Sequence, residues 1–259
     1  MLSKPPPPFG IAPGSARRPK KDNGFPLAGV LGYPISQSKS PKLHNYWLSK
    51  YKIQGFYVPF SVPTDKLKKT LSSLVHLGFR GVNITIPHKT AVLSFADSIT
   101  DRASLIGAAN TLYFSGNGKI HADNTDGHGF IQNILDTYPD YDFYDKVALI
   151  YGAGGSSRAI ASSLISNGIR EVRITNRTRS KAQIISENLG AKVLVIDWRS
   201  APENLKQADL IINTTSMGMV GQPEFSQPIS RASKSALVVD IVYNPLQTDL
   251  IKQANSLNL

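Results

Sequence analysis

The amino-acid sequence predicts an α/β protein of two domains, the second of which holds a doubly wound parallel sheet. Three observations support this prediction. Short apolar runs alternate with helical patterns along most of the chain, one of these runs ends in a glycine-rich turn, and 259 residues are enough for two domains. Strands that alternate with helices imply right-handed crossovers and parallel pairing. We expect a first domain over 26–126, to which 246–259 returns, and a second domain over 127–245.

The stretch 146–158 is central to the second domain. The apolar run Val147–Tyr151 predicts a buried strand, and the residues from 156 to 168 predict a helix that ends at a glycine. The turn between them consists of Gly152, Ala153, Gly154, Gly155 and Ser156. Such a turn suits a dinucleotide pyrophosphate, because the helix start presents free N–H groups and glycines let phosphates approach the backbone. Ser157 replaces the third glycine of the motif, so a turn that only packs strand against helix is the alternative.

The remaining strands of the second domain follow at regular intervals. Four apolar runs predict them: 171–176, 192–196, 210–213 and 236–242. Helical patterns separate most of these runs, and a helix over 125–138 leads into the domain. This alternation is typical of a doubly wound sheet of the Rossmann type.

The first domain alternates in the same way. Five apolar runs predict its strands: 27–32, 55–60, 80–86, 110–114 and 119–122. The last two flank a Ser-Gly-Asn-Gly turn and predict a hairpin. A helix is predicted from Pro41 to about residue 52 with Ser40 as its N-cap, and another over 64–76, where leucines share one face. Pro87 is expected to open a further helix.

The composition excludes several classes of protein. No apolar run approaches the ~18 residues of a membrane-spanning helix. The absence of cysteine excludes a disulfide framework, a thiolate nucleophile and a cysteine-based metal site. The five histidines are scattered, and none pairs with acidic residues at ligand spacing, so we expect no metal site. A cytoplasmic location is the expectation for a chain of this kind, and a homodimer is left open.

The first 25 residues differ from the rest. They combine the proline run 5–8 with a basic cluster at 17–21, which predicts a disordered basic tail rather than part of a packed core. No apolar segment of a secretory signal is present there. The formal net charge of +11 suits anionic small molecules and also nucleic acid. A basic nucleic-acid binder is the weakest alternative, because no recognition module accompanies the charge.

Three polar clusters follow predicted strands of the first domain, where open α/β sheets bind their ligands. They lie at 38–40, at 83–89 and at 110–111 together with 123–126. Each cluster alone has a structural explanation, since serine, threonine and asparagine serve helix caps and turns. Together they supply hydroxyls, amides, a lysine and a carboxylate, which is the set that a polyhydroxylated acid requires.

These clusters resemble those of one enzyme family, the shikimate dehydrogenases, in order and in spacing. The resembling segments are GYPISQSKSPKLHN (32–45), GVNITIPHK (81–89), GAANTL (107–112), DNTDG (123–127), GAGGSSRA (152–159), NRT (176–178), NTTSMG (213–218) and DIVYNP (240–245). The resemblance covers about 25–259. It implies the reversible, NADPH-dependent reduction of 3-dehydroshikimate to shikimate, a step of the shikimate pathway of aromatic amino acid biosynthesis.

The resemblance also implies roles for individual residues. Lys89 and Asp126 match the catalytic pair of the family. The residues implied in binding the substrate are Ser38, Ser40, Thr85, Asn110 and Tyr243, with Ser38, Ser40 and Tyr243 at its carboxylate. Oxidation of a secondary alcohol needs a base for the hydroxyl proton while hydride leaves carbon, and reduction is the reverse. We expect Lys89 to be this acid and base, and Asp126 to orient it.

The choice of cofactor follows from the end of the second strand of the nucleotide domain. A carboxylate at this position would bind the ribose hydroxyls of NAD. This chain has Asn176, Arg177 and Thr178 there, with Lys181 one turn later. An arginine can stack on adenine or hold a 2′-phosphate, so NADP is the predicted cofactor. The resemblance places Met217, Gly218 and Ile241 near the nicotinamide, although a Met or an Ile there also suits a core.

The family pattern continues beyond the last residue, Leu259, with a glycine-rich turn and a helix that carries a substrate-binding glutamine. A chain without them is expected to expose apolar surface and to lack one polar contact. Two readings therefore stand beside the NADP-dependent shikimate dehydrogenase: an NAD-using quinate/shikimate dehydrogenase, against which Arg177 argues, and a shortened NADP-binding protein with impaired catalysis.

Overall fold

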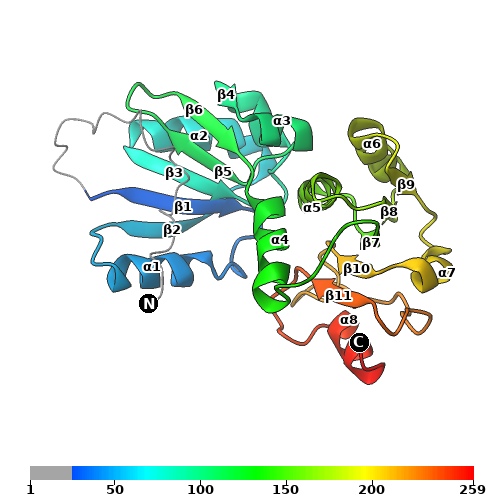
Figure 1. The fold of residues 1–259 in the computed structure, drawn as a ribbon. Helices are drawn as coiled ribbons and strands as arrows, with labels where there is room; N and C mark the ends of the chain where they lie inside the picture. Colours follow the sequence, from blue (N-terminus) through cyan, green and yellow to red (C-terminus); the bar gives the residue numbers. More distant parts are fainter. Residues whose placement is uncertain (1–24) are drawn as a thin grey trace.

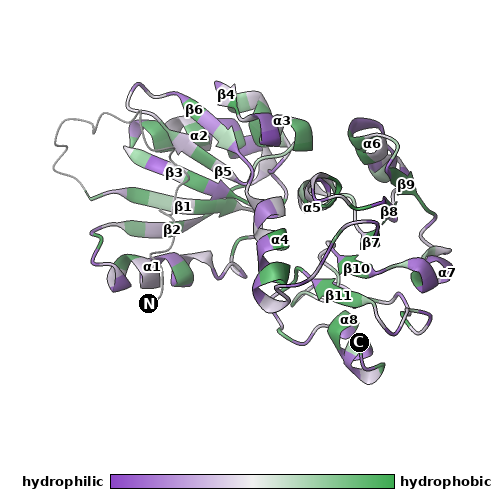
Figure 2. Cartoon of the chain, viewed as in Figure 1, coloured by the Kyte–Doolittle hydropathy of each residue, from purple (hydrophilic) through white to green (hydrophobic). Residues whose placement is uncertain are grey.

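The computed structural model describes residues 25–259, which form two α/β units joined through helix α4 (Figure 1). Phe25 is thus the only residue of the predicted basic tail that is described, and the rest of that prediction lies outside the described residues. Each unit has its own sheet and its own buried apolar clusters. Figure 2 shows hydrophobic residues concentrated on the strands, and hydrophilic residues on outer helices such as α6.

The sheet of the first unit has six strands in the order β2-β1-β3-β5-β6-β4. Their bounds are β1 Leu27–Gly32, β2 Phe56–Ser61, β3 Phe79–Ile84, β4 Ser98–Ile99, β5 Thr111–Phe114 and β6 Ile120–Asp123. Strands β2, β1 and β3 are parallel, whereas β5 runs antiparallel to both β3 and β6. The predicted hairpin is therefore confirmed.

Short helices surround this sheet: α1 Ser40–Lys50, α2 Leu67–His76, α3 Asp101–Ile106, and the 3₁₀ turns η1 Thr64–Lys66 and η2 Ala91–Phe95. Leu67, Leu71 and Leu74 of α2 are buried on one face, as the leucine spacing predicts.

The sheet of the second unit has five parallel strands in the order β11-β10-β7-β8-β9. Their bounds are β7 Val147–Tyr151, β8 Glu171–Thr175, β9 Val193–Val195, β10 Leu210–Asn213 and β11 Leu237–Asp240. The helices are α5 Gly155–Ser166, α6 Arg179–Leu189, α7 Ala201–Asn204, the 3₁₀ turn η3 Leu205–Gln207 and α8 Asp249–Ser256. This order is the doubly wound order of a Rossmann-type sheet, and its direction reverses between β7 and β10, where such sheets bind ligands.

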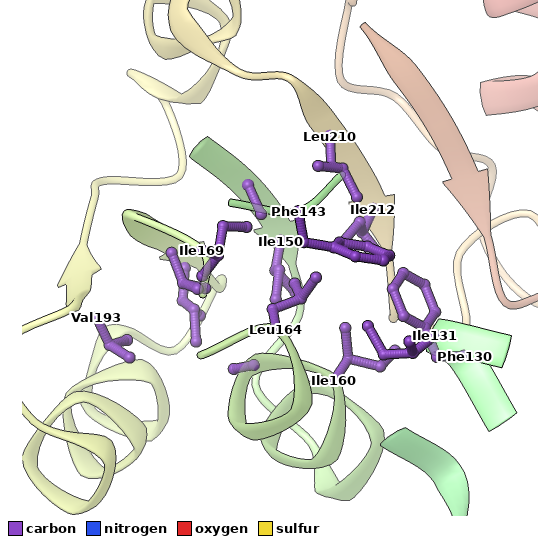
Figure 3. Close-up of a cluster of buried hydrophobic side chains, with 14 of the residues drawn as sticks. Phe130, Ile131, Phe143, Ile150, Ile160, Leu164, Ile169, Val193, Leu210 and Ile212 are labelled. Atoms are coloured by element: carbon purple, nitrogen blue, oxygen red, sulfur yellow. The ribbon is translucent and has the colours of Figure 1, made fainter. Parts of the chain in front are cut away.

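Helix α4 (Asp126–Thr137) begins beside the first sheet and ends in the core of the second unit. Its residues Phe130, Ile131 and Ile134 are buried together with Ile160 of α5 and Ile212 of β10. Figure 3 shows the Phe130 and Ile131 side chains close to Ile160. The core of the second unit therefore fixes the direction in which the first turn of α4, with Asp126, enters the space between the sheets.

The C-terminal segment differs from the expectation that 246–259 returns to the first domain. Leu250 and Ala254 of α8 instead pack against Leu149 and Ile211 of the second sheet. The reason is the amphipathic pattern of α8, whose apolar side covers the sheet from which it emerges.

Two local predictions are wrong, and one helix was not predicted. Ser40 is the first residue of α1 rather than its N-cap, which is Lys39, and no side chain caps this helix. The segment after Pro87 forms a turn and the short η2 rather than an α-helix. Helix α3 was not predicted, although the Thr100 hydroxyl accepts a hydrogen bond from the Ala103 N–H at its start and Gly107 ends it with φ of 68°.

Gly127 decides how closely α4 approaches α5. A Cβ atom at this position would lie 2.0 Å from Ser163 Oγ and 2.5 Å from the Ala159 carbonyl oxygen. We expect Gly127→Ala to lower the free energy of unfolding by about 1–3 kcal/mol, because the backbone of α5 must move. Urea unfolding monitored by tryptophan fluorescence measures this change.

Gly129→Ala is the matched control on the same helix. No atom lies within 4 Å of a Cβ built there. Because alanine favours the helix over glycine by about 1 kcal/mol, this variant should be as stable as the unmodified protein or more so. Equal destabilisation by both substitutions would contradict the close packing of α4 on α5.

Candidate active site

A cavity of about 510 Å³ lies between the two units. It opens beside the turn after β7, the start of α5, the end of β3 and the loop after β10. The candidate residues that line it are Lys89, Gly152, Ala153, Gly154, Gly155, Ser156, Asn176, Arg177, Lys181 and Met217. The cavity thus brings the lysine of the first unit into the same space as the glycine turn of the second.

The glycine turn is shaped by close contacts. Gly152 has φ of 113°, and a Cβ atom there would lie 2.5 Å from Thr214 Oγ1. Gly155 faces the first unit, since its Cβ would lie 3.0 Å from Lys89 Cβ. Gly154 has nothing within 4 Å of the Cβ position, so the backbone is open to the cavity there. Free space beside the first N–H groups of a helix fits the pyrophosphate of a dinucleotide.

Ser157, which replaces the third glycine of the motif, has a structural task. Its hydroxyl accepts a hydrogen bond from the Gly154 N–H at 3.0 Å and lies 2.6 Å from Thr214 Oγ1. Thr214 Oγ1 donates in turn to the Tyr151 carbonyl at 2.7 Å. These contacts hold the start of α5 against the ends of β7 and β10, so the serine preserves the shape of the turn.

Lys89, Asp126 and Asn110 form the polar centre of the site. Lys89 Nζ donates to Asp126 Oδ2 at 2.5 Å and to Ser156 Oγ at 3.0 Å. Asn110 Nδ2 donates to the other carboxylate oxygen, Asp126 Oδ1, at 2.7 Å. The side chains of Lys89 and Asp126 are only 14% and 21% exposed. In such a partly desolvated place the ion pair is stronger than a surface pair.

The backbone fixes these side chains in place. The Ala109 N–H donates to the Lys89 carbonyl at 2.7 Å, which holds the turn after β3 against the start of β5. Asn124 is buried; its Oδ1 accepts the Asp126 N–H at 2.9 Å, and its Nδ2 donates to the Ala108 carbonyl at 2.9 Å. Asn124 was not among the predicted site residues, although it stands in the DNTDG segment.

Three residues predicted to bind the substrate carboxylate, Ser38, Ser40 and Tyr243, lie near one another outside the wall of this cavity. Ser38 and Ser40 lie at the start of α1, where the helix dipole favours an anion. Tyr243 reaches this helix from the other unit, because its hydroxyl accepts the Lys39 N–H at 3.4 Å. Beside it, Asn244 Nδ2 donates to Gln37 Oε1 at 2.8 Å. Thr85 directly follows β3, and its N–H donates to the Leu31 carbonyl at 2.9 Å.

The end of β8 carries the residues predicted to select the cofactor. Arg177 and Lys181 are exposed at the cavity, and no ion pair within residues 25–259 involves either of them. Asn176 Nδ2 donates to the Thr178 carbonyl at 2.8 Å, which shapes the turn into α6. Both cations are therefore available to an anionic group at the open end of the cavity.

Three predicted cofactor residues do not line the cavity. Thr178 is the N-cap of α6. Gly218 turns the chain with φ of 83°, and its N–H donates to the Pro223 carbonyl at 2.8 Å. Ile241 packs against the core of the second unit. The structure thus brings Met217 but not these three to the cavity wall.

The cavity wall includes residues that the sequence did not single out, among them Arg158, Trp198, Thr214 and Thr215. Arg158 is half-buried in the first turns of α5, and burial lowers the pKa of its guanidinium. Thr214 and Thr215 follow the apolar run of β10, so a polar pair directly after a buried strand was the available signal.

Asp240 at the end of β11 carries a half-buried carboxyl that is hydrogen-bonded to Asn213 of β10. Burial raises its pKa above the ordinary value of 3.8, and hydrogen bonds from Thr248, Val242 and Asn213 oppose the rise. Thr248 Oγ1 donates to Asp240 Oδ2 at 2.7 Å, and Asn213 Nδ2 donates to Asp240 Oδ1 at 3.0 Å. These bonds connect β10, β11 and the start of α8.

Two further observations concern residues 25–259. No group of three or more His, Asp or Glu side chains is arranged to hold a metal ion among them. None of the described helices combines the length and the apolar character needed to cross a membrane.

Comparison with known proteins adds independent findings. Residues 30–112 match the family model described as the shikimate dehydrogenase substrate binding domain, and residues 134–255 match the model described as shikimate / quinate 5-dehydrogenase. The chain is 48% identical to the shikimate dehydrogenase (NADP(+)) of Cereibacter sphaeroides, over 90% of this chain and 83% of that protein.

Solved structures agree with these matches. A Thermus thermophilus shikimate 5-dehydrogenase in complex with NADP(H) and shikimate has a TM-score of 0.80 and 31% identity, over 91% of this chain and 85% of that one. A quinate dehydrogenase of Corynebacterium glutamicum in complex with NAD has a TM-score of 0.81 and 28% identity, over 90% and 86% of the two chains.

The raised pKa of Asp240 predicts a pH-dependent effect of Asp240→Asn. When the pKa of a carboxyl is higher in the folded than in the unfolded state, the folded state binds more protons between the two pKa values. The free energy of unfolding therefore falls as the pH rises through this range. The asparagine cannot ionise. The stability of the variant relative to the unmodified protein should therefore increase as the pH rises above about 4, until the folded-state carboxyl is ionised. Thermal unfolding at several pH values measures this difference, and a difference that does not change with pH would contradict the assignment.

Proposed function

This chain belongs to the shikimate dehydrogenase family, and we propose that it catalyses the reversible, NADPH-dependent reduction of 3-dehydroshikimate to shikimate. The observation that carries the proposal is the contact of Lys89 Nζ with both Asp126 and Ser156. It puts a potential proton donor of the first unit at the start of the helix that suits a dinucleotide pyrophosphate. The proton donor and the hydride donor would therefore lie in the same cavity.

In this proposal, the residues 26–126 bind the substrate and 127–245 bind NADP. Hydroxyls of Ser38 and Ser40 hold the substrate carboxylate at the start of α1, with Tyr243 beside them. Thr85, Asn110 and Asp126 contact the ring hydroxyls. Neutral donors at a helix start bind a carboxylate without an arginine, because the helix dipole supplies positive potential.

Lys89 is the acid and base of the reaction. As an ammonium group it donates a proton to the substrate oxygen during reduction, and as an amine it takes the hydroxyl proton during oxidation. Asp126 holds Nζ at 2.5 Å and, with Asn110, directs it toward the cavity. NADPH, when bound, supplies the hydride.

The glycine turn and the end of β8 would hold NADP. Gly155 and Ser156 would offer backbone N–H groups to the pyrophosphate, and Gly154 leaves space for it. Arg177 and Lys181 face the position of the 2′-phosphate, and the turn after β8 contains no carboxylate that would repel it. Met217 lies at the cavity wall on the side of β10, where the nicotinamide half would extend.

The direct test is the reduction of NADP⁺ with shikimate, followed by NADPH absorbance and repeated with NAD⁺ and with quinate. We expect kcat/KM for NADP⁺ to exceed that for NAD⁺ by about 10- to 100-fold, the range that corresponds to hydrogen bonds to a charged group. Equal use of NAD⁺, or a preference for quinate, would favour the quinate/shikimate dehydrogenase reading. Binding of NADP⁺ without turnover would contradict the proposed reaction.

Lys89→Ala should lower kcat by about 10²- to 10⁴-fold, the usual contribution of a positioned acid or base, and should change the KM for shikimate much less. Steady-state kinetics in both directions give the two constants. Lys66→Ala is the control, because this lysine is largely exposed and distant from the cavity. An unchanged kcat in Lys89→Ala would contradict the assignment of Lys89 as the acid and base.

A further inference from the structure

A chain of hydrogen bonds, here called the relay, connects Tyr57 of β2 with the Lys89–Asp126 pair. From this geometry we infer that Tyr57 and Thr111, which touch neither Lys89 nor Asp126, are positioning residues for the proposed reaction. They act by fixing the side-chain amides of Asn83 and Asn110, and through Asn110 the carboxylate of Asp126. The inference rests on the proposed function.

The first half of the relay lies on the α1 side of the first sheet. The Tyr57 hydroxyl donates to Asn83 Oδ1 at 2.7 Å. The side chain of Ser40, at the start of α1, also acts on this phenol, because it opposes the rise in the Tyr57 pKa that burial causes. Tyr57 therefore lies between the predicted carboxylate site and β3.

The second half crosses from β3 to β5 and then to α4. Asn83 and Thr111 are direct neighbours on adjacent strands, and Asn83 Nδ2 donates to Thr111 Oγ1 at 3.2 Å. Thr111 Oγ1 donates to Asn110 Oδ1 at 2.9 Å. Asn110 Nδ2 donates to Asp126 Oδ1, and Lys89 binds the second oxygen of the same carboxylate. The relay thus ends at the ion pair.

All donors of the relay point in one direction. Each group from Tyr57 to Asn110 donates toward Asp126, and the carboxylate is the final acceptor. Hydrogen bonds in such a series polarise and strengthen one another. The direction also fixes both amides, because Asn83 and Asn110 each accept at the oxygen and donate at the nitrogen. A flipped Asn110 amide would place its oxygen against Asp126 Oδ1, and a flipped Asn83 amide would place its oxygen against the Asn110 carbonyl oxygen.

Burial, ring stacking and hydrogen bonds together fix the position of Tyr57. Its side chain is 3% exposed, and its ring stacks on His44 with centroids 4.1 Å apart and planes at 4°. The side chain of Asn45 binds both its backbone groups, with Nδ2 donating to the Tyr57 carbonyl at 2.8 Å and Oδ1 accepting the Tyr57 N–H at 3.0 Å. Two residues of α1, His44 and Asn45, therefore set the position of the Tyr57 hydroxyl.

Two substitutions break the relay at separate points and keep the packing. Tyr57→Phe retains the ring and the contacts of Asn45, and Thr111→Val is nearly isosteric. Tyr57→Phe leaves Asn83 Oδ1 without its donor and should lower kcat for shikimate oxidation by about 5- to 30-fold. Thr111→Val removes one donor to Asn110 Oδ1, which keeps the Thr125 N–H at 3.0 Å, so its loss should be smaller, about 2- to 10-fold. The KM for NADP⁺ should stay within about twofold, because the relay ends at Asp126 and does not reach the turn after β7.

Non-additivity distinguishes positioning from loss of structure. Two breaks in one series should cost no more than the larger single break, so Tyr57→Phe combined with Thr111→Val should match the worse single variant. Thr111→Ser, which keeps the hydroxyl, should restore most of the activity lost in Thr111→Val. Tyr141→Phe is the control, because its buried hydroxyl has no hydrogen-bond partner among the described residues; its kcat should be unchanged.

The outcomes separate the two proposals. No turnover of shikimate by the unmodified protein would contradict the proposed function itself. Normal turnover by the unmodified protein, together with losses that multiply in the double variant, would overturn the relay alone. So would equal kcat values of Thr111→Val and Thr111→Ser. Should Tyr57→Phe not fold, as judged by its thermal unfolding, this pair of Thr111 variants decides the question.

Discussion

The position of one ammonium group depends on both halves of this molecule. Lys89 Nζ binds Asp126 at the start of α4 and Ser156 at the start of α5, so an error in the placement of either helix would displace it. The rest of the fold can be understood from this requirement. Three contacts fix the position of Lys89 Nζ relative to these helices. They are the close approach of α4 to α5 at Gly127, the hydrogen bonds of the buried Asn124 in the DNTDG segment, and the hydrogen bond from the Ala109 N–H to the Lys89 carbonyl.

The two sides of the cavity use different physical means to receive an anion. The first unit offers hydroxyls at the start of α1, whereas the second offers open backbone at Gly154 and, after β8, two cations that form no ion pair with any residue of 25–259. Helix dipoles act on both sides, and they need no mobile charge. Arg177 and Lys181 lie at the outer end of the cavity. There water screens charges, so full positive charges are needed to bind a phosphate.

Much of the fold could be predicted from the sequence because its strands are buried apolar runs between turn residues. The ranges 27–32, 147–151 and 210–213 coincide with β1, β7 and β10. Helix α3 escaped prediction because it has only six residues, three of them polar, and its caps at Thr100 and Gly107 are brief signals. The course of 246–259 was predicted wrongly because an amphipathic helix does not reveal which sheet its apolar side will cover.

The candidate site was less accessible to prediction, since its contacts join distant positions. Lys89 and most of the predicted cofactor residues line the cavity, whereas the residues predicted to bind the substrate do not, and the bond from Lys89 to Ser156 spans 67 positions. Tyr57 gave no signal at all, because an aromatic residue in an apolar run is expected in a core. Its role becomes visible only when the sheet places its hydroxyl against Asn83.

The measurement that tests this account most directly is a crystal structure of the protein with NADP⁺ and shikimate bound together. The account predicts the reacting hydroxyl oxygen within about 2.6–3.2 Å of Lys89 Nζ, the distance needed for proton transfer. It also predicts the substrate carboxylate at Ser38 and Ser40 and the pyrophosphate at the start of α5. A substrate bound away from Lys89, or a reacting hydroxyl directed to another proton acceptor, would contradict it.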